Sequence, residues 1–181
     1  MIPFVPFPKI ARLNREIVIT EKIDGTNALV HIADDGVTVT AGSRTRWITP
    51  DDDNFGFAAW VEEHSDELRR LGPGSHFGEW WGRGIQRGYG LDHRRFSLFN
   101  THRWADGAVR PTCCYVVPVM YRGPMSLEVV RVTLAMMCTL GSTAAPWFPK
   151  PEGVVVFHTA SSTLYKVTCE KDESPKGIVA T

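Results

Sequence analysis

Short β-rich runs separated by turn residues recur along the chain, and this pattern limits the fold more than any other feature. Two β-hairpins are predicted, with strands at residues 27–33 and 37–41 around Asp34-Asp35-Gly36, and at 153–158 and 163–168 around Ala160-Ser161-Ser162. Further strands are expected at residues 16–20, 76–81, 96–100 and 114–120. Pro118 puts a break or a sheet edge in the last of these. Many short strands joined by tight turns indicate antiparallel sheet.

Two segments have helical periodicity instead. In residues 54–71 apolar side chains recur every three or four positions, after potential capping residues at 51–53 and before Gly72-Pro73. Residues 127–140 carry apolar side chains on one face, and Gly141 is the expected stop. Strands outnumber helices, so the predicted fold class is α+β, with antiparallel sheets and flanking helices.

Length and composition suit one globular domain. The chain has 181 residues, 43% of them hydrophobic and 22% charged, so a hydrophobic core of ordinary size can form without stabilising disulfides or metal ions. We expect a single domain over residues 1–181, with no accessory domain at its C-terminal end. Twenty Lys and Arg balance twenty Asp and Glu, which excludes a protein that grips polyanions by bulk charge alone.

The four cysteines have neither paired C-x-x-C spacing nor the density of a disulfide-stapled domain, so we interpret Cys113, Cys114, Cys138 and Cys169 as reduced core thiols. The first residues contain three prolines in eight positions and do not resemble a signal peptide. No run approaches the roughly 20 apolar residues of a membrane span. A soluble protein of the cytoplasm, without membrane contact, is expected.

The segment Glu21-Lys22-Ile23-Asp24-Gly25-Thr26-Asn27 is the strongest candidate for chemistry, because its lysine stands between a predicted strand and a turn glycine. Lys22 and Asp24 would share one face of an extended chain. A lysine attacks an electrophile only as the neutral amine, which burial or a neighbouring cation favours. The alternative interpretation is a surface ion pair between Lys22 and Asp24.

Five further segments follow in a fixed order: Ser43-Arg44, residues 77–86 (FGEWWGRGIQ), residues 96–99 (FSLF), residues 152–156 (EGVVV) and residues 164–167 (LYKV). Together with the Lys22 segment they resemble the six nucleotidyltransferase motifs of covalent polynucleotide ligases and capping enzymes. The stretch at 77–86 is more similar to RNA ligases of the phage and editing type than to DNA ligases. The resemblance extends from Glu21 to Lys166 and implies an adenylyltransferase domain.

The resemblance implies a role for each matching residue. Lys22 would attack the α-phosphorus of ATP to form lysyl-AMP. The backbone of Glu21 would face the adenine edge, Asp24 and Asn27 would belong to the nucleotide site, and Arg44 would lie near ribose or phosphate. Glu79 would accept a hydrogen bond from a ribose hydroxyl, and Phe99 would stack on adenine. Phe96 is expected in the core. Taken singly, Arg44 also suits a surface arginine, and Phe99 a core side chain.

The last two motifs imply the metal and phosphate contacts. Glu152 would organise Mg²⁺, or Mn²⁺ as the alternative ion, and Lys166 would bind the α-phosphate and assist catalysis. A cross-strand ion pair between Glu152 and Lys166 is the structural alternative. The sequence departs from the family pattern at Thr168, where a second lysine is common, and Lys171 or Lys176 would have to replace it.

Five arginines and one acid, Asp92, lie between positions 83 and 103, with Tyr89, His93 and three glycines among them, and a fourth glycine, Gly82, directly before them. This basic segment is either a path for a nucleic-acid 5′-phosphate or a solvated loop that offsets the acidic residues of 62–67. The arginines are Arg83, Arg87, Arg94, Arg95 and Arg103.

The resulting hypothesis is an ATP-dependent RNA ligase that joins 5′-phosphate and 3′-hydroxyl ends, with RNA ends or a nicked duplex as substrate. Only fifteen residues follow Lys166, so we expect the nucleic-acid substrate to be bound by this domain or by a protein partner. The alternatives are DNA nick sealing, guanylyl transfer, and a nucleotide- or RNA-binding module without turnover. The last alternative rests on Thr168 and on the expected absence of an accessory domain.

Overall fold

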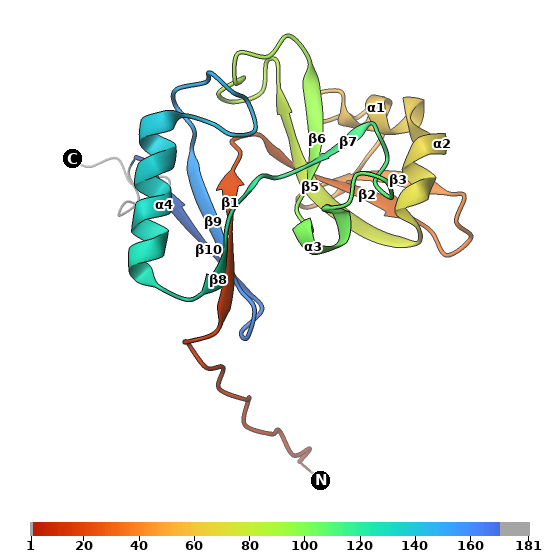
Figure 1. The fold of residues 1–181 in the computed structure, drawn as a ribbon. Helices are drawn as coiled ribbons and strands as arrows, with labels where there is room; N and C mark the ends of the chain where they lie inside the picture. The colour runs from red at the N-terminus through yellow and green to blue at the C-terminus, as the bar shows by residue number, and fades with distance from the viewer. Residues whose placement is uncertain (1, 171–181) are drawn as a thin grey trace, which may run out of the picture.

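The computed structural model describes residues 2–170 and contains two β-sheets, each covered on one face by helices (Figure 1). The four-stranded sheet has the order β10-β9-β1-β8 and is antiparallel throughout. The six-stranded sheet has the order β4-β3-β2-β5-β6-β7, and its only parallel pair is β6 with β7. The predicted α+β class with antiparallel sheets and flanking helices is confirmed.

The elements have the following bounds. The strands are β1 (Glu16–Lys22), β2 (Thr26–Ile32), β3 (Val39–Ser43), β4 (Trp47–Ile48), β5 (Gly74–Gly82), β6 (Arg94–Leu98), β7 (Cys114–Val116), β8 (Val119–Pro124), β9 (Gly153–His158) and β10 (Thr163–Thr168). The helices are α1 (Phe57–Glu63), α2 (Ser65–Leu68), the 3₁₀ turn η1 (Arg69–Leu71), α3 (Thr101–Trp104) and α4 (Leu127–Leu140).

The chain crosses between the sheets twice. It leaves the four-stranded sheet after β1, builds the whole six-stranded sheet, and returns after β7 to form β8, α4, β9 and β10. The two crossings are adjacent, because the N–H of Glu21 donates to the carbonyl of Pro118 at 3.0 Å. Residues at the end of β1 are thereby brought between the sheets.

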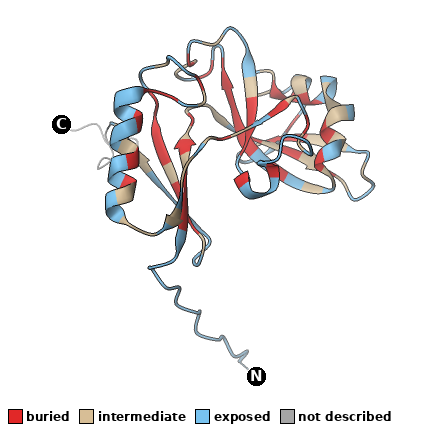
Figure 2. Cartoon of the chain, viewed as in Figure 1, coloured by how far each residue is buried: buried red, intermediate tan, exposed pale blue. Residues whose placement is uncertain are grey.

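Each sheet buries the face that its sequence alternation makes apolar. In β2, Ala28, Val30 and Ile32 are buried against a core that includes Phe57 and Val61 of α1. In the other sheet, Ile17, Ile19, Val154 and Val156 pack with Val130 and Met137 of α4. A third, smaller cluster of Ile23, Trp81, Tyr89, Val117 and Ala145 joins the two halves. Figure 2 shows the buried residues concentrated along the strands and on the inner faces of the helices.

Both predicted hairpins form, and the strands of the second coincide with β9 and β10. The helix predicted at 127–140 is α4, and it ends at Gly141 as expected. Pro118 breaks the strand predicted at 114–120 into β7 and β8, which belong to different sheets.

The single helix predicted at 54–71 is wrong, because the segment is divided at His64 into α1, α2 and η1. The His64 ring nitrogen Nδ1 lies 2.9 Å from the carbonyl oxygen of Trp60, which also accepts the His64 backbone N–H. The i→i−4 bond of a continuous helix is thus still formed at this point, and the division lies in the His64 backbone, whose φ of −103° and ψ of 14° leave the helical region. The N-cap residue of α1 is Gly56, and Asp53, three residues before it, satisfies the first turn, because its carboxylate accepts from the N–H groups of Ala58 and Ala59.

The interpretation of all four cysteines as reduced thiols is also wrong. Cys138, near the end of α4, forms a disulfide with Cys169, which follows β10, and their Cα atoms are 5.9 Å apart. The packing of α4 against β9 and β10 brings the two cysteines together, although 31 positions separate them in sequence. Cys113 and Cys114 are free thiols. In the described part of the chain, no helix has the length and apolar character needed to cross a membrane.

Candidate active site

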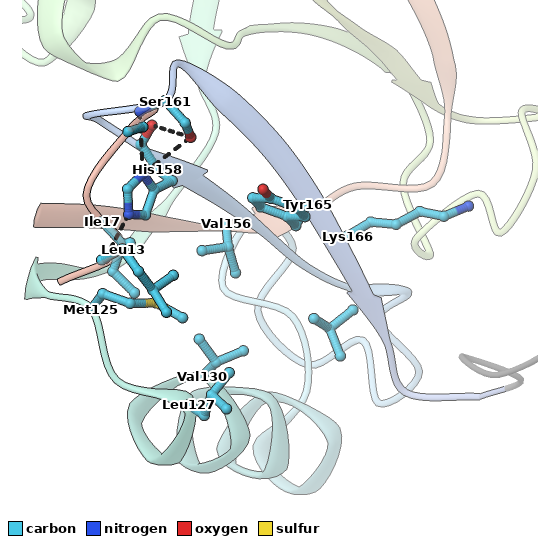
Figure 3. Close-up of a pocket in the computed structure, with 12 residues that line it drawn as sticks. Leu13, Ile17, Met125, Leu127, Val130, Val156, His158, Ser161, Tyr165 and Lys166 are labelled. Carbon is cyan, nitrogen blue, oxygen red and sulfur yellow. Dashed lines mark hydrogen bonds between the residues drawn. The ribbon is translucent and has the colours of Figure 1, made fainter. Parts of the chain in front are cut away.

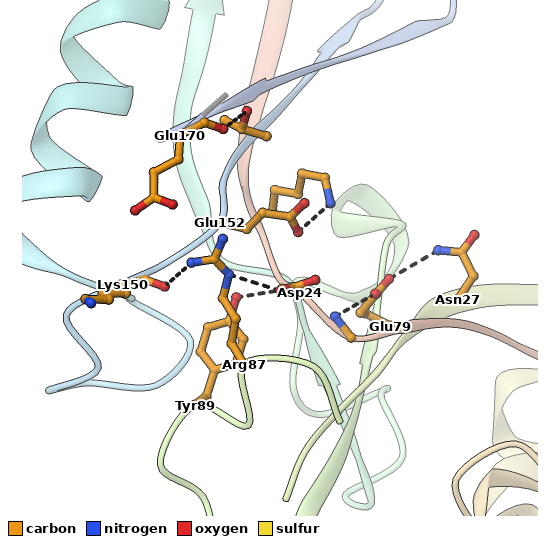
Figure 4. Close-up of polar contacts among 11 residues, drawn as sticks. Asp24, Asn27, Glu79, Arg87, Tyr89, Lys150, Glu152 and Glu170 are labelled. Carbon is orange, nitrogen blue, oxygen red and sulfur yellow. Dashed lines mark hydrogen bonds and ion pairs between the residues drawn. The ribbon is translucent and has the colours of Figure 1, made fainter. Parts of the chain in front are cut away.

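Lys22 is the last residue of β1 and lies where the chain passes from one sheet to the other. Its Nζ donates to Oε2 of Glu152 at 2.6 Å, and the Glu152 side chain is only 7% exposed (Figure 4). The antiparallel pairing of β1 with β9 explains the contact, because Lys22 lies opposite Gly153, the neighbour of Glu152. A partly exposed lysine that is paired with a buried carboxylate therefore forms the centre of the candidate site.

Asp24 has other partners than Lys22. Its carboxylate accepts from Nε of Arg87 at 3.0 Å, and its backbone N–H donates to the hydroxyl of Tyr89 at 2.8 Å (Figure 4). Burial raises the pKa of Tyr89 above its usual range, so this hydroxyl stays protonated. The structure thus contains ion pairs of Lys22 with Glu152 and of Asp24 with Arg87 in place of the alternative Lys22–Asp24 pair.

Glu79 of β5 approaches the same point from the six-stranded sheet. Its carboxylate accepts from the N–H of Gly25 at 3.0 Å and from Nδ2 of Asn27 at 3.2 Å. The residue is 8% exposed, and burial raises its pKa to about 7, although the hydrogen bond from Asn27 and the charge of Lys22 oppose the shift. Gly25 is required for this approach, because a Cβ there would lie 2.4 Å from the carbonyl oxygen of Trp80.

The side chain of Glu21 has a structural role beside the candidate site. Its side chain is 1% exposed and accepts from Ser142 Oγ at 2.5 Å and from the N–H groups of Thr143 and Ala144 at 2.9 and 2.8 Å. The carboxylate thereby fixes the loop that follows α4 against β1. Sequence reasoning missed this loop, because a separation of more than 120 positions leaves no local signal.

Lys166 lies on the same face of its sheet as Lys22. It is paired with Val155, which is paired with Thr20, and Thr20 and Lys22 share a face because they are two residues apart. Figure 3 shows its side chain directed away from the apolar cavity of about 560 Å³ on the α4 side of the sheet. Within residues 2–170, Lys166 makes no ion pair, so the alternative Glu152–Lys166 pair is not formed.

Thr168 lies opposite Gly153, and its hydroxyl donates to the carbonyl of Glu170 at 2.9 Å. Lys171 and Lys176, named above as replacements for the missing second lysine, lie outside the described residues.

Phe99 follows β6 and lies on the same face of the six-stranded sheet as Glu79, because Glu79 is paired with Ser97, two residues earlier. It is 41% exposed, whereas Phe96 is fully buried in the core, as expected. Arg44 is exposed in the turn between β3 and β4. The six-stranded sheet thus presents the Glu79 carboxylate and the Phe99 ring on a single face.

The arginines of the basic segment make separate contacts with the protein. Arg94 donates to the carbonyls of Arg83 and Phe55, Arg95 lies over the rings of Trp81 and Tyr115, and Arg103 donates to the carbonyl of Leu71. Arg87 reaches Asp24 and the carbonyl of Lys150. Four of the five arginines are therefore tied into the structure, whereas Arg83 is exposed and its side chain makes no hydrogen bond or ion pair within residues 2–170.

Solved structures of RNA ligases have the same fold. A Naegleria gruberi RNA ligase variant with ATP and Mn matches with a TM-score of 0.66 and 17% identity, over 87% of this chain and 51% of that one. An apo variant matches with a TM-score of 0.63 and 18% identity, over 86% and 50%. The chain spans about half the length of these solved chains, and at such identities the likeness concerns the fold.

The sequence identifies the family. The pattern of the RNA ligase family matches residues 15–170, which include β1 and β10 and all the site residues described above, so the chain belongs to this family. No curated protein sequence matches the chain.

Proposed function

We propose that this chain is the nucleotidyltransferase domain of an ATP-dependent RNA ligase and that Lys22 is its nucleophile. The observation that carries the proposal is the placement of Lys22 Nζ at the crossing between the two sheets, 2.6 Å from Glu152 and close enough to Glu79 for its charge to act on that carboxylate. Family membership and the fold of ligases solved with ATP and Mn support it.

In the first step Nζ of Lys22 attacks the α-phosphorus of ATP. The nitrogen–phosphorus bond forms as the bond to pyrophosphate breaks, and the amine must lose a proton. The Glu152 carboxylate contacts Nζ and is in position to accept that proton. Lys166, on the same sheet face, would stabilise charge on the α-phosphate.

The remaining residues would hold the nucleoside. Phe99 is exposed and offers an aromatic face to adenine. Glu79 would accept from a ribose hydroxyl, Asn27 would orient Glu79 through its amide, and Arg44 would contact ribose or phosphate oxygens. The backbone of Glu21 would face the adenine edge, and Asp24 would support the site through the turn at Gly25.

A divalent ion would be held here by a protein carboxylate together with the bound nucleotide. Among residues 2–170 no three candidate metal ligands lie together, so the protein alone does not form a cage. Magnesium commonly uses one or two carboxylates together with substrate phosphates and retained water. Glu152 would hold it with the nucleotide, and the ion would supply neutralisation of phosphate charge.

In the second and third steps, AMP passes from Lys22 to an RNA 5′-phosphate, and a 3′-hydroxyl then displaces AMP to form the phosphodiester. Correct placement and electrostatic stabilisation would supply most of the rate. RNA ends or a nicked duplex are the substrates proposed here.

The test is incubation with ATP labelled at the α-phosphate and Mg²⁺, followed by denaturing electrophoresis. The parent protein is expected to carry covalent AMP and Lys22→Ala none, while Lys9→Ala, an exposed lysine outside the site, keeps the parent level. An unlabelled parent would contradict the proposal and favour a binding module without turnover. Labelling with GTP would indicate guanylyl transfer, and a comparison of RNA and DNA ends identifies the polymer.

A further inference from the structure

The guanidinium of Arg87 contacts two separate segments of the candidate site. Its Nε donates to Asp24 Oδ2 at 3.0 Å, and its Nη1 donates to the carbonyl of Lys150, also at 3.0 Å (Figure 4). Asp24 lies two residues after Lys22, and Lys150 lies two residues before Glu152. One side chain therefore joins the segments that carry the two members of the Lys22–Glu152 pair.

The loop that presents Arg87 is anchored on both sides. Ile85 is fully buried, and Tyr89 is 2% exposed and packs against Trp81 and Phe148. The Tyr89 hydroxyl also accepts the backbone N–H of Asp24. Arg87 thus projects from a fixed position between two buried residues.

The chemistry of arginine suits this position better than that of lysine. A guanidinium is planar and directs several N–H donors outward at fixed angles, so it can bind a carboxylate and a carbonyl at once. A lysine ammonium could neutralise Asp24 but would not hold the same two directions. Without Arg87, the Asp24 carboxylate would lose its cation, two residues from the ammonium of Lys22.

We propose that Arg87 is a positioning residue for lysyl-AMP formation, acting through Asp24 and Lys150 to hold Lys22 and Glu152 in register. This inference rests on the proposed function. It assigns to Arg87 a role that does not require contact with ATP or RNA. The expected effect is large, because a displacement of about 1 Å in a reacting group costs on the order of 10²-fold in rate.

The experiment measures the single-turnover rate of lysyl-AMP formation at increasing ATP concentrations for the parent, Arg87→Gln, Arg87→Lys and Arg110→Gln. The last variant is the matched control, because the Arg110 guanidinium likewise donates to two separate groups, the carbonyls of Cys114 and Trp104, outside the candidate site. Arg87→Gln is expected to lower the maximal rate about 10²-fold and to change the apparent KM for ATP less than about twofold. Arg87→Lys should recover less than a tenth of the loss, and Arg110→Gln should match the parent.

A combined variant tests whether Arg87 acts through Asp24. If Arg87 acts through Asp24, Asp24→Asn and Arg87→Gln together should lose much less than the product of the two separate losses. Three results would each overturn the proposal: a combined variant whose loss of rate equals the product of the two separate losses, an effect of Arg87→Gln on KM alone, or a parental rate in Arg87→Lys.

Crystal structures of the parent and Arg87→Gln give a readout that is independent of activity. The variant should have the Lys22–Glu152 contact displaced from 2.6 Å, and an unchanged contact would overturn the positioning role. A parent that forms no lysyl-AMP would instead refute the proposed function, and the two crystal structures would still decide whether Arg87 holds the pair.

Discussion

The disulfide between Cys138 and Cys169 leads to a quantitative prediction about stability. The bond closes a loop of 31 residues between the end of α4 and the residue after β10. Closing a loop of this length lowers the entropy of the unfolded chain, and the chain-entropy relation gives about 3.7 kcal/mol at 25 °C. Replacing Cys138 and Cys169 together by serine should therefore lower the free energy of unfolding by about 3.7 kcal/mol.

Urea unfolding followed by tryptophan fluorescence measures the effect, with and without dithiothreitol. The parent should lose about 3.7 kcal/mol on reduction, whereas the double serine variant should be insensitive to the reductant. Cys113→Ser is the matched control and should keep the sensitivity of the parent, because Cys113 is a free thiol. Thiol titration of the unfolded protein should find two thiols before reduction and four after it.

The prediction has a clear point of failure. A parent protein that unfolds at the same urea concentration with and without reductant would refute the entropic reasoning. Four titratable thiols in the unreduced protein would show that the bond does not form, and the original interpretation of reduced cysteines would then be correct.

Three further substitutions test the candidate site. Glu79→Gln should remove a pH dependence of the free energy of unfolding. Burial raises the pKa of Glu79 in the folded protein to about 7 from 4.5, so the protonated carboxyl group stabilises the fold fully below about pH 4.5, and this stabilisation is lost as the pH rises through 7. Between pH 4 and 8 the free energy of unfolding of the parent, measured in urea, should fall by about 3 kcal/mol more than that of the variant. Equal dependence of the two unfolding free energies on pH would contradict this. Gly25→Ala should cost about 2 kcal/mol or more, because its Cβ would meet the Trp80 carbonyl oxygen, whereas Gly36→Ala, where the added Cβ meets nothing within 4 Å, should cost about 1 kcal/mol in the same assay. Glu21→Ala should lower the unfolding free energy by about 3 kcal/mol by leaving buried donors unpaired, and Glu21→Gln should cost less because an amide can still pair with them; equal costs would be inconsistent with the hydrogen-bonding account.

Local patterns predicted the regular elements well. The helix at 127–140 and the strands at 153–158 and 163–168 have the predicted bounds, because periodicity and turn residues determine such elements within a few positions. The helix predicted at 54–71 is divided at His64, where the backbone angles leave the helical region. A change of backbone angles at one residue does not alter the apolar periodicity of the sequence.

The amino-acid sequence by itself determined the α+β class, the order of the motifs and the choice of Lys22 as the candidate nucleophile, because all three depend on residue types and spacing along the chain. Only the tertiary structure decided which charges meet. Lys22 pairs with Glu152 across 130 positions, Asp24 pairs with Arg87 across 63, and Cys138 joins Cys169. These partners are chosen by strand register and by the crossing between the sheets, which bring distant segments within hydrogen-bond distance. No local spacing in the chain encodes that distance.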